Sequence, residues 1–245
     1  MMYLTEPNLK SVVWKQYVCK LKSLSGIFPS LMVVQVLSFA LSLGGTGSSG
    51  TGYGGVSIHV RYFSGELISQ FTFWWAIIVG FWLTIKNYRE TDFFFVTNRL
   101  ASHLSTIVLL LTASLYAGIT VPLLGFFLRL VVYWRNMNVI LNDVAPSPDE
   151  LLMSLLVTAG YAALFSCLGY AAGMLFQLSE VMFSILLGTY IGLSFTPATS
   201  EFIQNVHRFY NAESSVLLFT MKVALTLCLV YAFIIFLTNR LEVRR

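Results

Sequence analysis

The sequence predicts an all-α membrane protein with six transmembrane helices, an N-terminal amphipathic interfacial helix and a short outer amphipathic helix between spans five and six. Three observations lead to this fold class. Of the 245 residues, 57% are hydrophobic and only 11% are charged, whereas about 25% are charged in an average soluble domain. Six segments approach the roughly 20 apolar residues that cross a bilayer. Basic residues also gather on one side of the predicted membrane.

The number and distribution of charged residues exclude two classes of protein: a water-soluble protein and a nucleic-acid-binding protein. Fifteen basic and eleven acidic residues are too few to cover a soluble protein of this length with polar surface, so lipid must be part of the solvent. The net charge of +4 comes from short basic clusters beside apolar segments. Nucleic acid would require a broad basic face instead, so it is excluded as a partner.

The first element is a helix predicted over residues 8–24, after Pro7. Lys15 and Lys22 lie on one side of this helix, and the other side is mainly apolar. This pattern predicts a basic helix at the cytoplasmic headgroups, where anionic lipid attracts the ammonium groups. A frayed extension of the first span is the alternative. The apolar side consists of Val13, Trp14, Tyr17, Val18, Leu21 and Leu24.

Six apolar segments follow as predicted spans. They cover residues 27–43, 67–85, 104–124, 151–176, 181–195 and 215–237. The Gly-rich segment 44–55 is predicted to be a flexible external linker, because it lacks the Lys-Ser/Thr end of a phosphate-binding loop. Segment 199–210 follows Pro197 and carries apolar residues at the spacing of one helical face. It predicts the short helix on the outer side.

The distribution of basic residues predicts the orientation, because short loops rich in Lys and Arg stay cytoplasmic. With the N-terminus inside, ten basic residues fall on the cytoplasmic side: Lys10, Lys15, Lys20, Lys22, Lys86, Arg89, Arg99, Arg240, Arg244 and Arg245. Four fall on the opposite side: Arg61, Arg129, Arg135 and Arg208. We therefore expect both termini to be cytoplasmic and the number of spans to be even.

No catalytic or metal-binding motif is found in the sequence. The three histidines fall in separate segments, without partners at ligand spacing: His59, His103 and His207. The three cysteines form no disulfide framework and are expected to be packing residues: Cys19, Cys167 and Cys228. No G-x-S-x-G elbow is present. The chain is therefore not expected to be an enzyme or to bind a cofactor directly.

Lys222 is the one ionisable residue that lies clearly within a predicted span. Its side chain either reaches outward to the membrane surface or faces a water-filled cavity, and both interpretations stay open. Glu66 and Glu180 lie at span edges, and no acidic residue lies mid-span. The lack of such groups counts against a carrier driven by an ion gradient.

Two pairs of glycines are spaced four residues apart in spans four and five, Gly169 with Gly173 and Gly188 with Gly192. Small residues at this spacing let helix backbones approach closely in lipid. We expect tight packing within the chain at these positions, with contact between two copies as the alternative.

The segment 86–100 is the most informative part of the sequence. It combines charged residues with an aromatic triplet, in the order KNYRETDFFFVTNRL. Aromatic anchors ringed by charge are typical of a protein-docking surface. The alternative is that the rings dip into the headgroup layer as an aromatic belt.

This arrangement of elements resembles the ABC-2-type permease family over the whole chain. The loop RETDFFFVTNRLASHLS is also similar to that of small Gram-positive permeases of this kind, including the permease subunits of phenol-soluble-modulin exporters. The resemblance implies a bacterial cell-membrane protein that forms a translocation pathway. It also implies two partners, a separate ATPase subunit that binds and hydrolyses ATP and a second permease subunit, more often identical than different.

The resemblance assigns roles to named residues. The coupling contacts with the ATPase fall on Arg89, Glu90, Asp92, Phe93, Phe94, Phe95 and Arg99, with a smaller contact at Gln177 and Glu180. The substrate pathway falls on Phe73, Trp74, Phe183, Leu186 and Tyr190. The expected function is the membrane-spanning subunit of an exporter for an apolar or amphipathic peptide, toxin or antibiotic. The alternative is an ion-gradient-driven carrier or channel, and an intramembrane enzyme is a third class.

Overall fold

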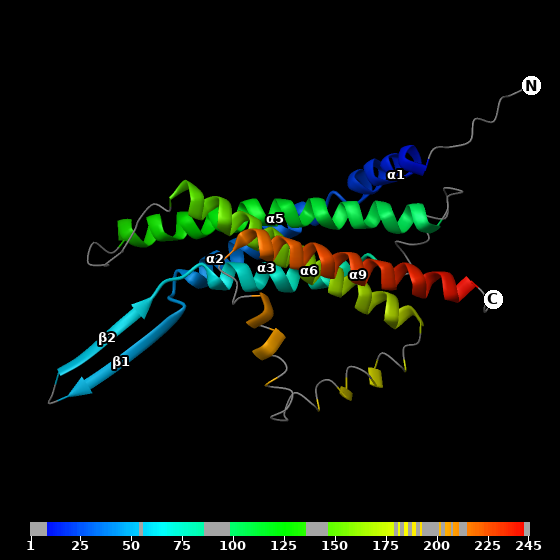
Figure 1. Ribbon diagram of the computed structural model, residues 1–245. Helices are drawn as coiled ribbons and strands as arrows, with labels where there is room; N and C mark the ends of the chain where they lie inside the picture. Colours follow the sequence, from blue (N-terminus) through cyan, green and yellow to red (C-terminus); the bar gives the residue numbers. More distant parts are fainter. Residues whose placement is uncertain are drawn as a thin grey trace, which may run out of the picture.

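The computed structural model describes residues 9–53, 56–85, 99–135, 147–178 and 215–242, with isolated positions and short stretches between 181 and 210. The described chain is a bundle of helices that carries a two-stranded hairpin (Figure 1). Its elements are α1 (Leu9–Ser23), α2 (Ile27–Ser42), β1 (Gly47–Tyr53), β2 (Val56–Tyr62), α3 (Glu66–Trp82), α5 (Arg99–Arg135), α6 (Pro148–Leu178) and α9 (Val216–Glu242).

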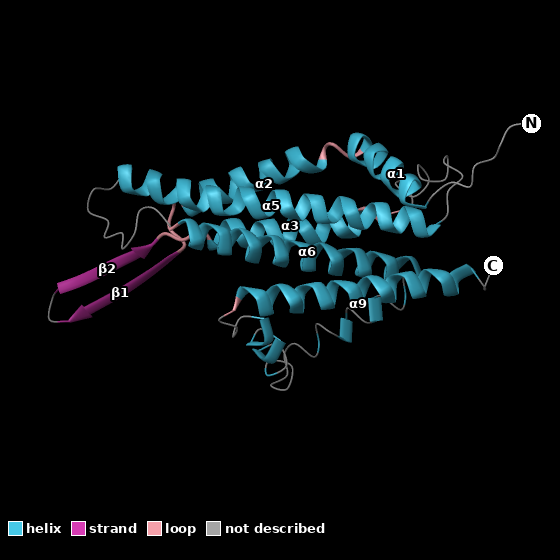
Figure 2. Cartoon of the chain, turned by 45° about the horizontal axis from the view of Figure 1, so that its top comes forward, coloured by secondary structure: helices cyan, strands magenta, loops and turns pink. Residues whose placement is uncertain are grey.

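The bundle has two distinct ends. At one end, which we call the hairpin end, α2 ends and α3 begins beside the two strands (Figure 1). The opposite end, which we call the terminal end, holds α1 and the last turns of α9 (Figure 1). Figure 2 shows α2 and α5 on one side of the bundle, α3 and α6 in the middle and α9 on the other side.

Three described helices are long and apolar enough to cross a membrane: α5, α6 and α9. The pair α1 and α2 passes the same length and composition test together, but it is bent by 51°. With 17 residues, α3 is about 26 Å long, slightly less than the hydrocarbon core of a bilayer. The chain is therefore a helical membrane protein, while six spans remain a prediction. Most of the predicted span 181–195 lies outside the described residues.

The N-terminal helix α1 packs on α5. Tyr17, Leu21 and Leu24 from the predicted apolar side lie against the core, but Trp14 from the same side is 62% exposed. The bend of 51° between α1 and α2 makes α1 a separate helix rather than a straight extension of the first span.

The prediction of a flexible linker over residues 44–55 is wrong for the residues that form β1. Gly47–Tyr53 pairs antiparallel with Val56–Tyr62, in a register that runs from Gly47↔Tyr62 to Tyr53↔Val56. The Thr46 amide donates to the Tyr62 carbonyl at 2.9 Å, which closes the base of the hairpin. The physical reason lies in β2, whose sequence VSIHVRY favours a strand and provides a hydrogen-bonding partner for the Gly-rich segment.

Helices α5 and α6 are longer than predicted. The expected span 104–124 is part of a 37-residue helix, because residues 126–135 contain no glycine or proline and continue the helix beyond Pro122 and Gly125. α6 begins at Pro148 rather than at residue 151. A capping box starts it: the Ser147 amide donates to Glu150 Oε2 at 3.1 Å, and the Glu150 amide donates to Ser147 Oγ at 3.3 Å.

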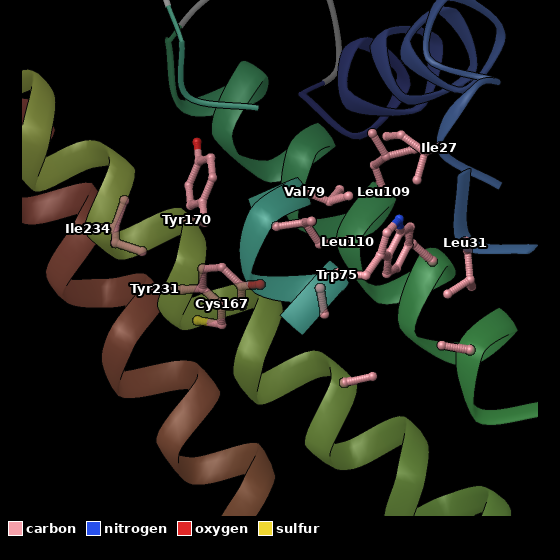
Figure 3. Packing of buried hydrophobic residues seen from close by; sticks show 14 of the residues in the cluster. Ile27, Leu31, Trp75, Val79, Leu109, Leu110, Cys167, Tyr170, Tyr231 and Ile234 are labelled. Carbon is pink, nitrogen blue, oxygen red and sulfur yellow. The ribbon is translucent and has the colours of Figure 1, made fainter. Parts of the chain in front are cut away.

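The apolar core lies between α2, α3, α5, α6 and α9 (Figure 3). Its largest member, Trp75 of α3, is 6% exposed and donates from Nε1 to Ser30 Oγ of α2 at 3.0 Å. On the other side of the core, Tyr231 of α9 lies beside Cys167 of α6 (Figure 3). Tyr231 and Cys167 are thus both buried between helices.

Candidate functional site

The predicted coupling segments adjoin helices that meet at the terminal end of the bundle. Arg99 is the first residue of α5, and Gln177 lies in the last turn of α6. The remaining predicted coupling residues lie outside the described residues: Arg89, Glu90, Asp92, Phe93, Phe94, Phe95 and Glu180.

Lys20 of α1 anchors that helix to the beginning of α5. Its ammonium donates to the Ser102 carbonyl at 3.0 Å, to Ser102 Oγ at 3.1 Å and to Thr106 Oγ1 at 2.8 Å. A lysine ammonium has three donors, and these contacts are enough to use all of them. In the sequence Lys20 is one of ten basic residues predicted on the cytoplasmic side, and nothing in the local pattern shows which helix it faces.

A second polar contact joins α5 to α6 one turn from the start of α5. His103 Nδ1 and the Tyr170 hydroxyl are 2.7 Å apart, and their rings meet edge to face at 6.2 Å between centroids. The start of α5 is thereby connected to both α1 and α6. The sequence placed His103 in isolation, and only the fold brings Tyr170 beside it.

The contact between α3 and α6 is built on glycines. A Cβ atom on Gly169 would lie 2.1 Å from the Ile77 carbonyl oxygen, and one on Gly80 would lie 2.2 Å from the Ser166 carbonyl oxygen. Gly173 meets the Thr84 hydroxyl in the same way. The predicted tight packing at Gly169 and Gly173 is therefore confirmed and occurs within the chain. At Gly188 and Gly192 the predicted packing is not found, since no atom of the described residues lies within 4 Å of a Cβ at either position. We call this contact the glycine seam.

A chain of aromatic rings continues from the glycine seam toward the hairpin end. Phe73 of α3 stacks on Phe165 of α6 at 5.1 Å between centroids and lies 5.9 Å from Tyr161. Tyr161 also contacts Phe219 of α9 at 5.2 Å and Tyr210 at 6.5 Å. We call this group the aromatic cluster: Phe73, Tyr161, Phe165, Phe209, Tyr210 and Phe219.

The structure separates the residues that were assigned to the substrate pathway. Phe73 belongs to the aromatic cluster. Its neighbour Trp74 is 67% exposed and lies on the outer surface of the described bundle, because adjacent helical residues point about 100° apart. Phe183, Leu186 and Tyr190 lie outside the described residues.

Lys222 of α9 joins the aromatic cluster at its edge. Its Nζ donates to the Phe209 carbonyl at 2.9 Å and lies 4.1 Å from the centroid of the Phe209 ring. A carbonyl oxygen and a ring face both stabilise a cation. The ammonium therefore ties the short helical stretch 208–210 to α9.

An apolar groove of about 200 Å³ lies between α5, α6 and α9. Ala159, Gly160 and Ala163 of α6 line it, together with Phe219 and Val223 of α9. Phe219 also belongs to the aromatic cluster. The groove and the aromatic cluster therefore share the Phe219 side chain of α9.

No metal centre is formed by the residues that the structure describes, since no three His, Cys, Asp or Glu side chains among them come together. The three cysteines are separate thiols. No known family model, curated protein or solved structure matches this chain. The described residues offer two candidate functional features, the polar contacts at the terminal end and the aromatic cluster.

Proposed function

We propose that this chain is the membrane-spanning permease subunit of an ATP-binding-cassette exporter. In this proposal a separate ATPase subunit docks on the terminal end and supplies the energy of ATP hydrolysis. A second permease subunit, most simply another copy of this chain, completes the translocation pathway in a bacterial cell membrane. The terminal end then faces the cytoplasm, as the basic residues of the sequence favour.

The observation that carries the proposal is the set of contacts around the first two turns of α5. These turns directly follow the charged and aromatic segment 86–98, and they are held to α1 by Lys20 and to α6 by His103. A force applied to that segment would move α1, α5 and α6 together. Such a connection is what an external motor requires, because coupling depends on contiguous packed contacts.

The aromatic cluster is the feature that favours an amphipathic substrate for the proposed exporter. Phe209 of the cluster is 48% exposed and offers apolar surface, and its π face attracts a cation, as the position of Lys222 illustrates. The cluster lies toward the hairpin end, away from the proposed ATPase. This placement agrees with movement of the substrate out of the cell, from the driven end of the bundle to the opposite end.

Co-expression with the ABC ATPase that the proposal requires, sought among the neighbouring genes, tests the proposal. We expect the two proteins to purify as a complex, and we expect Phe93, Phe94 and Phe95 together changed to Ala to abolish both the complex and export. If no complex forms and the triple variant exports normally, the chain is not an ABC permease.

A second pair of variants tests the connection through α1. Lys20→Met removes the three hydrogen bonds to α5, whereas Lys22→Met removes an exposed charge from the same helix turn. We expect Lys20→Met to lower export several-fold while the ATPase still binds, and Lys22→Met to leave export unchanged. Equal effects of the two variants would show that only the positive charge of α1 matters.

A further inference from the structure

The two halves of helix α2 bury different kinds of side chains. Its inward face near the terminal end consists of Ile27 and Leu31, which belong to the apolar core around Trp75 (Figure 3). On the same face nearer the hairpin end, the buried residues are Gln35, Ser38 and Ser42, each 0% exposed. The inward face therefore changes from apolar to polar within two turns.

The outward face of the same helix is apolar throughout its second half. Val33, Val36, Leu37 and Leu41 are each 58–61% exposed, as suits contact with lipid tails. A helix with a polar inward face and an apolar outward face, inside a membrane, is typical of one that borders an aqueous cavity.

Two threonines on neighbouring helices complete the polar group. Gln35 Nε2 donates to Thr120 Oγ1 of α5 at 2.9 Å and to Thr72 Oγ1 of α3 at 3.4 Å. Both threonine hydroxyls donate to carbonyls of their own helices, so they act as acceptors toward Gln35. The amide nitrogen of Gln35 is thus satisfied from both sides.

The amide oxygen of Gln35 is not satisfied. Among the described residues, Oε1 has no hydrogen-bond donor although it is fully buried. A buried acceptor without a donor destabilises the fold, because its lost hydration is not replaced. A site that retains such a group has an oxygen ready to accept a hydrogen bond.

The two serine hydroxyls do not hydrogen-bond to another helix. Ser38 Oγ donates to the Gln35 carbonyl at 2.9 Å, and Ser42 Oγ donates to the Ser38 carbonyl at 2.8 Å. Interhelical polar contacts in membranes run from one helix to another, whereas these hydroxyls donate within α2. Their burial is therefore not explained by helix association through hydrogen bonds.

We propose that Gln35, Ser38, Ser42, Thr72 and Thr120 form a membrane-embedded site for an uncharged hydrogen-bond donor, reached by water from the hairpin end and closed in this conformation. The ligand class follows from the composition of the site, which offers amide and hydroxyl oxygens and no charged side chain. Within the proposed exporter it would receive amide N–H groups of the substrate, but the site itself does not depend on an ATPase.

Cysteine labelling in membranes tests the proposal. In a chain with Cys19→Ser, Cys167→Ala and Cys228→Ala, Ser38→Cys or Leu31→Cys is introduced. Both positions are 0% exposed on the same face of α2, but they lie in its polar and apolar halves. A charged, membrane-impermeant maleimide is applied to one side of the membrane at a time, and Ser48→Cys on the exposed part of β1 identifies the side of the hairpin end.

We expect Ser38→Cys to react at least about ten times faster than Leu31→Cys from the side that labels Ser48→Cys, because only a thiol in contact with water forms the reactive thiolate. Leu37→Cys, on the exposed lipid-facing side, should react as slowly as Leu31→Cys. The proposal is overturned if Ser38→Cys does not react, reacts only from the other side, or reacts no faster than Leu31→Cys.

The role of Gln35 has its own test. In the Ser38→Cys background, Gln35→Leu should suppress labelling by making the site apolar, and Gln35→Asn should preserve it. Ser42→Cys provides a second reporter, and Gln35→Met, an apolar side chain of similar length, replaces Gln35→Leu if that variant fails to fold. If Gln35→Leu does not change the labelling rate of either Ser38→Cys or Ser42→Cys, Gln35 is not part of the site. Because the labelling needs no ATPase, a failed complex with an ATPase and a failed labelling experiment reject different proposals.

Discussion

The central helix α6 packs against α3 and α9 in two different ways. Toward α3 it presents Gly169 and Gly173, and the helix backbones come so close that no Cβ fits. Toward α9 it presents Gly160, where the nearest atom that a Cβ would meet is 3.0 Å away at the edge of the Phe219 ring. One contact is made between backbones, and the other is made by side chains.

The difference between these two contacts indicates which helices can move relative to one another. Helices in lipid gain no hydrophobic free energy from association, so close backbone packing supplies much of their attraction. The glycine seam uses that source, and at Gly169 and Gly80 the closest atoms across it belong to the backbone of the other helix. Contacts of α9 involve rotatable rings and Lys222. We therefore expect α3 and α6 to move as a unit, and α9 to move against them.

The largest effect should follow from Gly169→Ala. The new methyl group would lie 2.1 Å from a backbone oxygen of α3, so the helices must separate. We expect the free energy of unfolding to fall by about 3 kcal/mol or more, measured by SDS titration in mixed micelles. Gly188→Ala is the matched control, since no atom of the described residues lies within 4 Å of a Cβ at that position. Equal losses in both variants would show that the glycine seam is no tighter than the rest of the chain.

A smaller effect is expected at Gly173, because the atom nearest to an added Cβ belongs to the Thr84 side chain. Gly173→Ala should cost about 1–3 kcal/mol. Thr84→Ala should recover part of this loss in the double variant, with a coupling energy of about 1 kcal/mol. The same SDS titration measures the cycle. Strict additivity of the two substitutions would mean that Thr84 is not the obstacle.

At the α9 side, Lys222→Met should release the stretch 208–210 without unfolding the bundle. The variant loses the hydrogen bond and the ring contact with Phe209, together about 1 kcal/mol for a partly exposed ammonium. We expect trypsin to cut after the exposed Arg208 several times faster. Lys222→Arg should retain slow cleavage, and rapid cleavage in the wild-type chain would argue against the contact.

The smallest effect should come from Gly160→Ala. The Phe219 ring can shift by a few tenths of an ångström to accept the methyl group, and alanine favours the helix by up to about 1 kcal/mol. The unfolding free energy should therefore change by less than about 1 kcal/mol. A loss as large as that of Gly169→Ala would place the α6–α9 contact in the same class as the glycine seam.

Several elements were predictable because they depend on local sequence patterns. The spans at 27–43, 104–124 and 215–237 match α2, part of α5 and α9, since long apolar runs have few alternatives to a membrane helix. The Gly-rich half of the hairpin was missed, because its strand exists only through pairing with Val56–Tyr62. Gln35 and Ser38 interrupt an apolar run at helical spacing, but the run alone does not show that their face is buried against α3 and α5.

The sequence by itself determined that the chain belongs in a membrane, that α2, α3, α5, α6 and α9 are helical and that Gly169 and Gly173 pack closely. These properties follow from composition and from spacing along one helix. Only the tertiary structure decided that Lys20 faces Ser102, that Tyr170 meets His103 and that Phe73, but not Trp74, joins the aromatic cluster. Such contacts depend on the rotation of each helix about its axis, which an almost uniformly apolar helix does not encode in its own residues.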